Sequence, residues 1–219
     1  MNIRNLRVNR LREPIGVDWQ APIFSFQSDR EGVFLVSLYT GQDKLAVQER
    51  TVTDKNCGGF CFPLPLQPET AYRWSVFDGR EELFTCFETG IDTLPPPLYI
   101  EGARGDERAA VCRFYAPLTT RYARLYLAGE GVRCLVNGEH LGLGYPCTDT
   151  SKGTPRYRTY DISRLLGRGG ENDLRLCPST NKPQRIAASV VIGQRDGKKQ
   201  CRGLCLEDVA EKYLTAGKM

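Results

Sequence analysis

The chain has 219 residues and a mass of 24.6 kDa, which suits one large domain or two small ones. Its 41% hydrophobic and 26% charged residues exclude a wholly disordered chain. The net charge of +4 and the pI of about 8.6 are mild, so no nucleic-acid partner is expected. No run of 18 apolar residues is present, so we expect no membrane partner.

The N-terminal stretch MNIRNLRVNRL lacks the apolar core of a signal peptide. The sequence as given therefore predicts a cytoplasmic protein, or a periplasmic or secreted one if a leader has been removed. The same stretch carries arginines that alternate with apolar residues: Arg4, Arg7, Arg10 and Arg12, with Leu6, Val8 and Leu11 among them. This pattern favours a solvated strand face over an anion site, because no Gly-rich loop accompanies it.

Residues 1–92 contain short segments rich in Val, Phe and Tyr, and no helical period runs through them. The sharpest signal is LPLQPETAYRWSVFD, residues 64–78, in which Tyr72, Trp74 and Val76 fall on one strand face. A Pro-bearing corner before a strand Tyr is typical of a tyrosine corner, in which the ring packs inward and its hydroxyl bonds the backbone upstream. We therefore predict that Tyr72 and Trp74 are core residues of a fibronectin type III-like domain.

Three consecutive prolines, residues 95–97, give the best domain boundary in the chain. Prolines donate no backbone hydrogen bond and hold a stiff, extended form, so residues 93–97 are predicted to be a semi-rigid linker. From Leu98 the strand rhythm returns and continues to residue 205. Asn137-Gly138 predicts a two-residue hairpin turn, and IAASVVIGQ predicts a buried strand. Two β-sandwiches in tandem are the simplest architecture.

The stretch YRTYDISRLLGRGGENDL, residues 157–174, places one apolar turn between two strands. A helix this short cannot stand alone, because nucleating a helix is costly. Asp161 is predicted to cap the turn, while Ile162, Leu165 and Leu166 close the open end of a sandwich. Only the tail, residues 206–219, contains helical spacing, within LEDVAEKYL, which predicts a short C-terminal helix.

Nine cysteines form an odd set, and several occupy apolar strand positions, which favours buried free thiols. Cys57/Cys61 and Cys201/Cys205 share a CxxxC spacing, but zinc sites generally have tighter knuckles. We therefore expect no metal or other cofactor. A calcium ion bound by loop oxygens is an alternative that jelly rolls allow, although no dense acidic loop argues for one.

The sequence presents no catalytic constellation. His140 is the only histidine, so a histidine-dependent triad or a His-based metal site would depend on that residue alone. The motifs GxGxxG, GxxxxGK[ST], HExxH and GxSxG are absent. Adjacent carboxylates such as Glu81 and Glu82 point to opposite strand faces, unlike the paired acids of a glycosidase. We therefore predict no catalytic residue in this chain.

Several strings resemble the N-terminal region of bacterial α-L-rhamnosidases. They are IRNLRVNRLREPIGVDWQAPIFSFQ (3–27), PLPLQPETAYRWSVFD with CFETG (63–90), and ARLYLAGEGVRCLVNGEHLG with YRTYDISRLLGRGGENDL (123–174). The resemblance implies a fibronectin type III-like domain over 1–92, followed by a galactose-binding-like jelly roll over 98–205. The fold class expected is thus all-β, with the short helix or tail at 206–219.

The chain departs from this family in ways that matter for function. The (α/α)₆ catalytic barrel of the family has no counterpart here. The family's aromatic-rich string GYYELYING corresponds in this chain to GVRCLVNGE, which lacks the aromatic residues. The resemblance therefore implies a non-catalytic, carbohydrate-binding accessory region of a glycoside hydrolase. Its expected partners are the catalytic barrel of a parent protein and a rhamnose-containing glycan.

A sugar site on such a fold would use loop aromatics as stacking faces and polar side chains for the hydroxyls. The candidates in or beside the long loop are Tyr145, Asp149, Arg156 and Tyr157. The alternative for each is plain loop or strand surface. A stand-alone β-sandwich adhesion or protein-interaction module without sugar specificity is the competing functional hypothesis, and an intact enzyme with an unrecognised site is the third.

Overall fold

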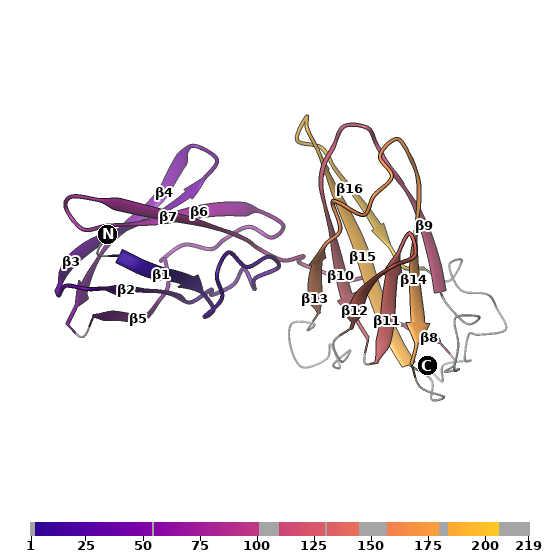
Figure 1. Cartoon of the computed structure of the whole chain (residues 1–219), viewed down its shortest axis with the longest axis horizontal. Coiled ribbons are helices and arrows are strands. Elements are labelled where there is room, and N and C mark those ends of the chain that lie inside the picture. The colour runs from indigo at the N-terminus through magenta and orange to yellow at the C-terminus, as the bar shows by residue number, and fades with distance from the viewer. Residues whose placement is uncertain are drawn as a thin grey trace. The chain divides into compact units, whose positions relative to one another are not determined.

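The computed structural model describes residues 3–53, 55–100, 110–129, 131–144, 157–179 and 184–205. The chain divides into two compact units, Met1–Asp92 and Thr93–Met219. The described residues form strands and turns without any helix, which confirms the predicted all-β fold (Figure 1). The helix expected within 206–219 lies outside the described residues. No helix long and apolar enough to cross a membrane occurs in the part of the chain that was searched.

The first unit is a three-stranded antiparallel sheet packed on a four-stranded one. Its strands are β1 (Ile3–Val8), β2 (Phe24–Ser28), β3 (Gly32–Thr40), β4 (Asp43–Val52), β5 (Asn56–Phe60), β6 (Ala71–Phe77) and β7 (Glu82–Glu88). The strand orders are β1-β2-β5 and β4-β3-β6-β7. The two packed antiparallel sheets form a β-sandwich, and the fibronectin type III-like assignment of residues 1–92 stays a prediction.

Aromatic rings fill the core between these two sheets. Trp74 is fully buried and its ring meets that of Phe24 edge-on at 5.3 Å, while Phe24 also contacts Phe62 and Phe87. Edge-to-face pairs of this kind add to the stabilisation from area burial. The Tyr72 hydroxyl accepts a hydrogen bond from the Gln67 backbone N–H at 2.8 Å, which is the geometry of a tyrosine corner.

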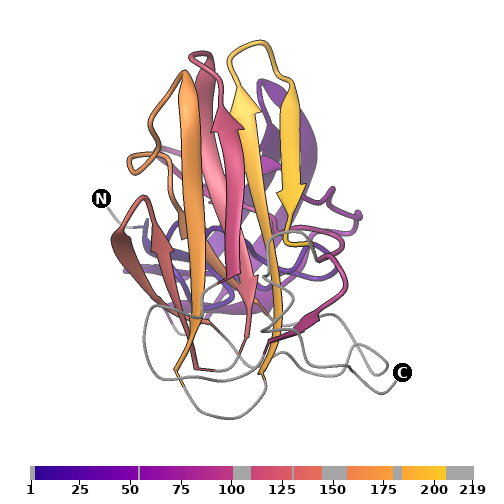
Figure 2. The same cartoon turned by 90° about the vertical axis from the view of Figure 1, so that its right-hand side faces the viewer.

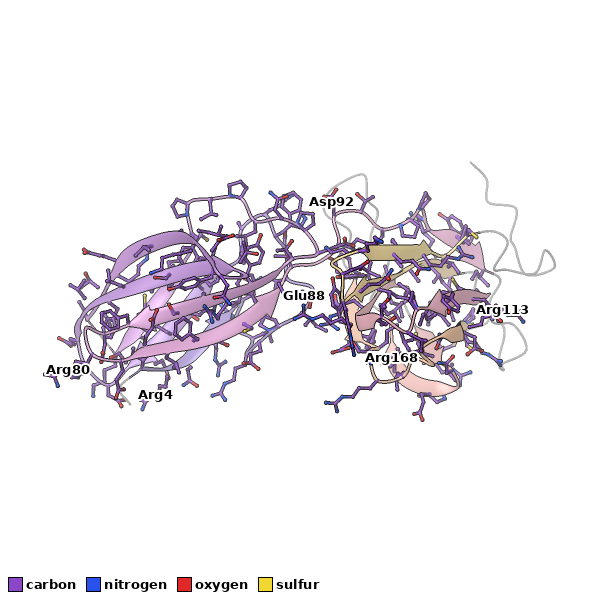
Figure 3. All side chains as sticks on the ribbon, turned by 90° about the horizontal axis from the view of Figure 1, so that it is seen from above. Arg4, Arg80, Glu88, Asp92, Arg113 and Arg168 are labelled. Carbon is purple, nitrogen blue, oxygen red and sulfur yellow. The ribbon has the colours of Figure 1, made fainter. Side chains whose placement is uncertain are left out.

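The N-terminal arginines lie on the surface of the first unit. Arg4 forms an ion pair with Asp29 at 2.7 Å and points outward (Figure 3). Arg12 donates to the Asn5 side chain at 2.6 Å. Leu6 and Val8 are buried, whereas Leu11 is 58% exposed, because the chain leaves β1 through a turn at residues 9 and 10 with positive φ angles.

The second unit contains nine described strands in two antiparallel layers (Figure 2). They are β8 (Leu98–Ile100), β9 (Ala110–Ala116), β10 (Thr120–Ala128), β11 (Val132–Val136), β12 (Glu139–Leu143), β13 (Arg158–Asp161), β14 (Gly170–Pro178), β15 (Gln184–Gln194) and β16 (Lys199–Gly203). One sheet has the order β13-β10-β15-β16, with β8 also paired to β15, and the other has the order β12-β11-β14-β9. Of the connections between successive described strands, only β11–β12 and β15–β16 stay within one sheet, and all the others pass from one sheet to the other.

Small and branched side chains fill the core of this unit. Ala123, Leu125 and Leu127 of β10 are fully buried and belong to one cluster with Val132 and Val136 of β11. On the other face of β10, Tyr126 is also buried, at 1% exposed. The reason is that Tyr157 packs edge-on against it, with the ring centroids 5.3 Å apart. The sequence shows that side chains of this strand alternate between two faces, but it does not show which residues cover each face.

The stretch between β13 and β14 is a single hydrogen-bonded turn rather than a helix. The Leu165 N–H donates to the Ile162 carbonyl at 3.0 Å, and Ile162 is fully buried. Leu165 and Leu166 are partly buried against the same core. Asp161 Oδ1 accepts from the Ser163 N–H at 3.0 Å, which is the local cap that the sequence predicts.

Candidate functional site

The four residues predicted to hold a sugar are only partly described. Tyr145, Asp149 and Arg156 lie outside the described residues. Tyr157 is half-buried and lies just before β13, on the outer face of the sheet that contains β10. Its ring stands perpendicular to that of Tyr126. Tyr157 is therefore anchored by the sheet on one side, and it remains the described member of the predicted cluster.

A polar network surrounds Asp161 on the same outer face, and we call it the Asp161 network. Arg124 of β10 and Asp161 of β13 are opposite each other in the strand register, and the guanidinium lies 2.9 Å from the carboxylate. The Ser163 hydroxyl donates to the same carboxylate oxygen at 2.5 Å. The Ala123 N–H donates to the Ser163 hydroxyl at 2.9 Å, which ties the network to β10.

The Asp161 carboxylate is held in its charged form. Partial burial acts to raise the pKa of Asp161, but hydrogen bonds from the Ser163 hydroxyl and N–H, with the charges of Arg124 and Arg164, outweigh that effect and lower it. A carboxyl group with a lowered pKa stays ionised at neutral pH, where it only accepts hydrogen bonds. The network can therefore accept hydrogen bonds from a polyol, but it is unsuited to general acid catalysis at neutral pH.

Tyr122 extends this outer face towards β15. A Cβ added at Gly193 would lie 2.1 Å from the Tyr122 ring, so the ring covers the Gly193 backbone directly. The Arg124 guanidinium lies 5.2 Å from the centroid of the same ring. A tyrosine ring and an ionised arginine–aspartate pair thus lie side by side. The sequence gives no local signal for this arrangement, because Asp161 and Gly193 are distant from Tyr122 in the chain.

A separate open groove of about 370 Å³ lies in the first unit. Its walls come from the segments 20–22 and 61–66, with Phe24 contributing to them, and three prolines line it. The lining offers few hydrogen-bonding side chains, and Gln20 is the one long polar residue among them. The groove is mainly apolar, and Cys61 contributes a thiol to its wall.

The thiols divide into buried and exposed groups. Cys112, Cys134 and Cys177 are at most 2% exposed, in agreement with the interpretation of strand cysteines as small hydrophobic residues. Burial, with a smaller effect from Cys177, raises the pKa of Cys134 to about 12. Cys57 and Cys61 belong to the first unit, and Cys201 and Cys205 to the second. Within the described ranges, no three His, Cys, Asp or Glu side chains gather in a way that could hold a metal ion.

Comparison with known proteins gives a likeness in structure alone. No family model matches the chain, and no curated protein matches its sequence. An α-L-rhamnosidase from Dictyoglumus thermophilum superposes with a TM-score of 0.67 and 17% identity, over 93% of this chain and 29% of that one. An α-L-rhamnosidase from Aspergillus terreus gives a TM-score of 0.67 and 17% identity, over 92% of this chain and 28% of that one.

At this level of identity the likeness establishes the fold. It extends over nearly the whole chain, so it includes strands of both units. The chain spans less than a third of the length of either rhamnosidase. A β-sandwich region related in fold to part of these enzymes is therefore shown, and its activity and ligands remain to be proposed.

Proposed function

We propose that this chain is a non-catalytic accessory region of an α-L-rhamnosidase-like glycoside hydrolase. The observation that carries the proposal is the shared fold over 93% of this chain with an α-L-rhamnosidase. The sequence strings at 3–27, 63–90 and 123–174 point to the same family independently of the coordinates. In this role the two sandwiches support a catalytic barrel that supplies the bond-breaking groups.

The size and activity of the native protein test this proposal. An antibody raised against the purified chain should detect, in extracts of the source organism, a protein much heavier than 24.6 kDa. The immunoprecipitate should hydrolyse an aryl α-L-rhamnoside, whereas the isolated 219-residue chain should not. A native species of 24.6 kDa without rhamnosidase activity would overturn the accessory role, and turnover by the isolated chain would overturn its non-catalytic character.

The finer proposal is that the second unit binds a rhamnose-containing glycan. Tyr145, Asp149, Arg156 and Tyr157 would form the site. Support comes from the anchored Tyr157 ring and from the Asp161 network on the same outer face, which offers charged groups to sugar hydroxyls. Aromatic faces and charge-assisted hydrogen bonds are the means by which such sites hold sugars.

A titration with L-rhamnose followed by NMR tests this binding. Both tryptophans, Trp19 and Trp74, lie in the first unit, so intrinsic fluorescence does not report on the second. We expect saturable shifts at millimolar sugar that are lost in Tyr157→Ala and Asp149→Ala. Tyr115→Ala, which removes a 53% exposed ring from β9, is the matched control and should bind normally. Absence of a saturable shift in the wild type would remove the glycan-binding role.

One observation favours the competing hypothesis of a protein-interaction module. The outer face of the sheet β4-β3-β6-β7 exposes Val33, Leu35 and Val47, which are 59%, 38% and 49% accessible. Exposed aliphatic side chains gathered on one sheet face are typical of interaction surfaces. This alternative would be favoured if the native polypeptide has a mass of 24.6 kDa on a denaturing gel but elutes in a larger complex on size exclusion.

A further inference from the structure

The outer face of β3, β4, β6 and β7 bears a group of aromatic and cationic side chains that the proposed function does not use. One cross-strand row consists of Lys44, Tyr39, Arg73 and Cys86, which are paired in register across the four strands. Phe84 precedes Cys86 by two residues on β7, so its side chain lies on the same face. We call Lys44, Tyr39, Arg73 and Phe84 the β6 cation cluster.

Two positive charges in this cluster share one aromatic ring. Lys44 Nζ lies 5.3 Å and Arg73 Cζ lies 5.1 Å from the centroid of the Tyr39 ring. Arg73 Cζ also lies 4.7 Å from the Phe84 centroid, and the two rings are 6.0 Å apart. Cation–π contacts fix where these side chains stand, but they leave the cations without a counter-charge.

No carboxylate among the described residues neutralises either cation. Neither Lys44 nor Arg73 takes part in an ion pair there, and the half-buried Arg73 has an inaccessible Nε without a hydrogen-bond partner in that part of the chain. Glu82 lies on the same face, but its Oε1 accepts from the Ser75 hydroxyl at 2.6 Å and lies 3.4 Å from the Tyr39 hydroxyl. Two like charges held close together are an arrangement that a bound anion stabilises.

We propose that the β6 cation cluster binds the carboxylate of an acidic sugar, a uronic acid residue of a glycan. Arg73 presents a planar fork that matches a carboxylate, and Lys44 adds a second charge beside it. The Phe84 ring, 41% exposed, offers an apolar surface next to the carboxylate for the C–H groups of a pyranose.

The choice of a sugar as the carrier of the carboxylate rests on the proposed association with a glycoside hydrolase. The cluster itself belongs entirely to the first unit, whereas the rhamnose candidates belong to the second. Binding at the two places is therefore measured separately. The native mass, which tests the accessory role, does not depend on any residue of this cluster.

Titration of the ¹⁵N-labelled chain with D-glucuronate tests the proposal, read at the Arg73 Nε–Hε signal. We expect saturable shifts with a Kd of about 1–10 mM at low salt. Raising NaCl from about 20 mM to about 500 mM should weaken binding severalfold, because an exposed ion pair is screened. D-glucose, the methyl ester of glucuronate and acetate should each shift this signal far less, since each lacks either the charge or the ring.

Charge variants give effects of opposite sign. Arg73→Gln should raise the Kd about tenfold, and Lys44→Gln should raise it by a smaller factor. Glu82→Gln should tighten binding, because it removes a nearby negative charge. The control is Arg80→Gln, which removes an equal charge from a side chain that points outward at a turn of the same unit (Figure 3). No saturable shift in the wild type would overturn the proposal, as would equal binding of acetate or the neutral ester, or an Arg80→Gln effect equal to that of Arg73→Gln.

Discussion

Asn172 Oδ1 accepts a hydrogen bond from Asn137 Nδ2 at 2.7 Å, across 35 positions of the chain. The same oxygen accepts from the Gly167 N–H at 2.7 Å, and Asn172 Nδ2 donates to the Gly167 and Gly170 carbonyls. Asn137 in turn donates to the Leu165 carbonyl at 2.8 Å. The β11–β12 turn, the apolar turn and β14 are thus joined by one buried and fully hydrogen-bonded amide.

We expect Asn172→Ala to destabilise the second unit by about 2–3 kcal/mol. The substitution removes a buried amide, 2% exposed, together with its hydrogen bonds to Asn137, Gly167 and Gly170, and each such bond contributes about 1 kcal/mol net. Urea unfolding followed by far-UV circular dichroism measures the change. Asp173→Ala removes a partly exposed ion pair with Arg175 and should cost under about 1 kcal/mol. Equal effects of the two variants would contradict this role of Asn172.

Tyr72→Phe should cost about 1 kcal/mol in the first unit. The variant keeps the stacked contact with Phe87, whose ring centroid lies 5.3 Å away, but removes the acceptor for the Gln67 N–H. Tryptophan fluorescence during urea unfolding reports this unit selectively. Tyr115→Phe, on an exposed ring of the second unit, should leave that transition unchanged. A Tyr72→Phe midpoint equal to the wild type would show that the corner hydrogen bond contributes nothing net.

Asp161→Asn should make the second unit less sensitive to acid. The folded-state pKa of Asp161 is lowered from the ordinary value of 3.8, so its stabilising contribution is present above that value and is lost as the pH falls through the lower folded-state pKa. The side chain is 55% exposed, so we expect at most about 1 kcal/mol at pH 7 after screening. The wild type and the variant should converge below pH 3.8. A difference in the free energy of unfolding that grows as the pH falls would contradict this prediction. Glu171→Gln, which changes an exposed side chain on β14, is the control.

Thiol alkylation under native conditions should separate the cysteines by burial. Cys61, Cys86 and Cys201 are exposed and should react with iodoacetamide within minutes at pH 8. Cys134, whose pKa is raised to about 12, should react only after denaturation. Peptide mass spectrometry with differential labelling measures both sets. Labelling of Cys134 at the rate of Cys86 would mean that the core of the second unit opens readily.

The sequence by itself determined the fold class and the local geometry. Alternation of side chains marks strands, a Pro-bearing corner before Tyr72 marks the hydroxyl bond to Gln67, and Asn137-Gly138 supplies the positive φ angles of a two-residue turn. These features depend on neighbours within a few residues, so a single chain displays them directly. The hydrogen bond from the Ser163 N–H to the Asp161 carboxylate is another such local feature, since it joins residues two positions apart.

Only the tertiary structure decided which distant side chains share a face. Arg124 meets Asp161, Tyr122 covers Gly193, and Arg73 lies between the rings of Tyr39 and Phe84, because strand register brings together residues that are far apart in the chain. A one-residue change of register would move every one of these side chains to the other face. The sequence carries the alternation, but the pairing that builds a binding surface is a property of the folded sheets.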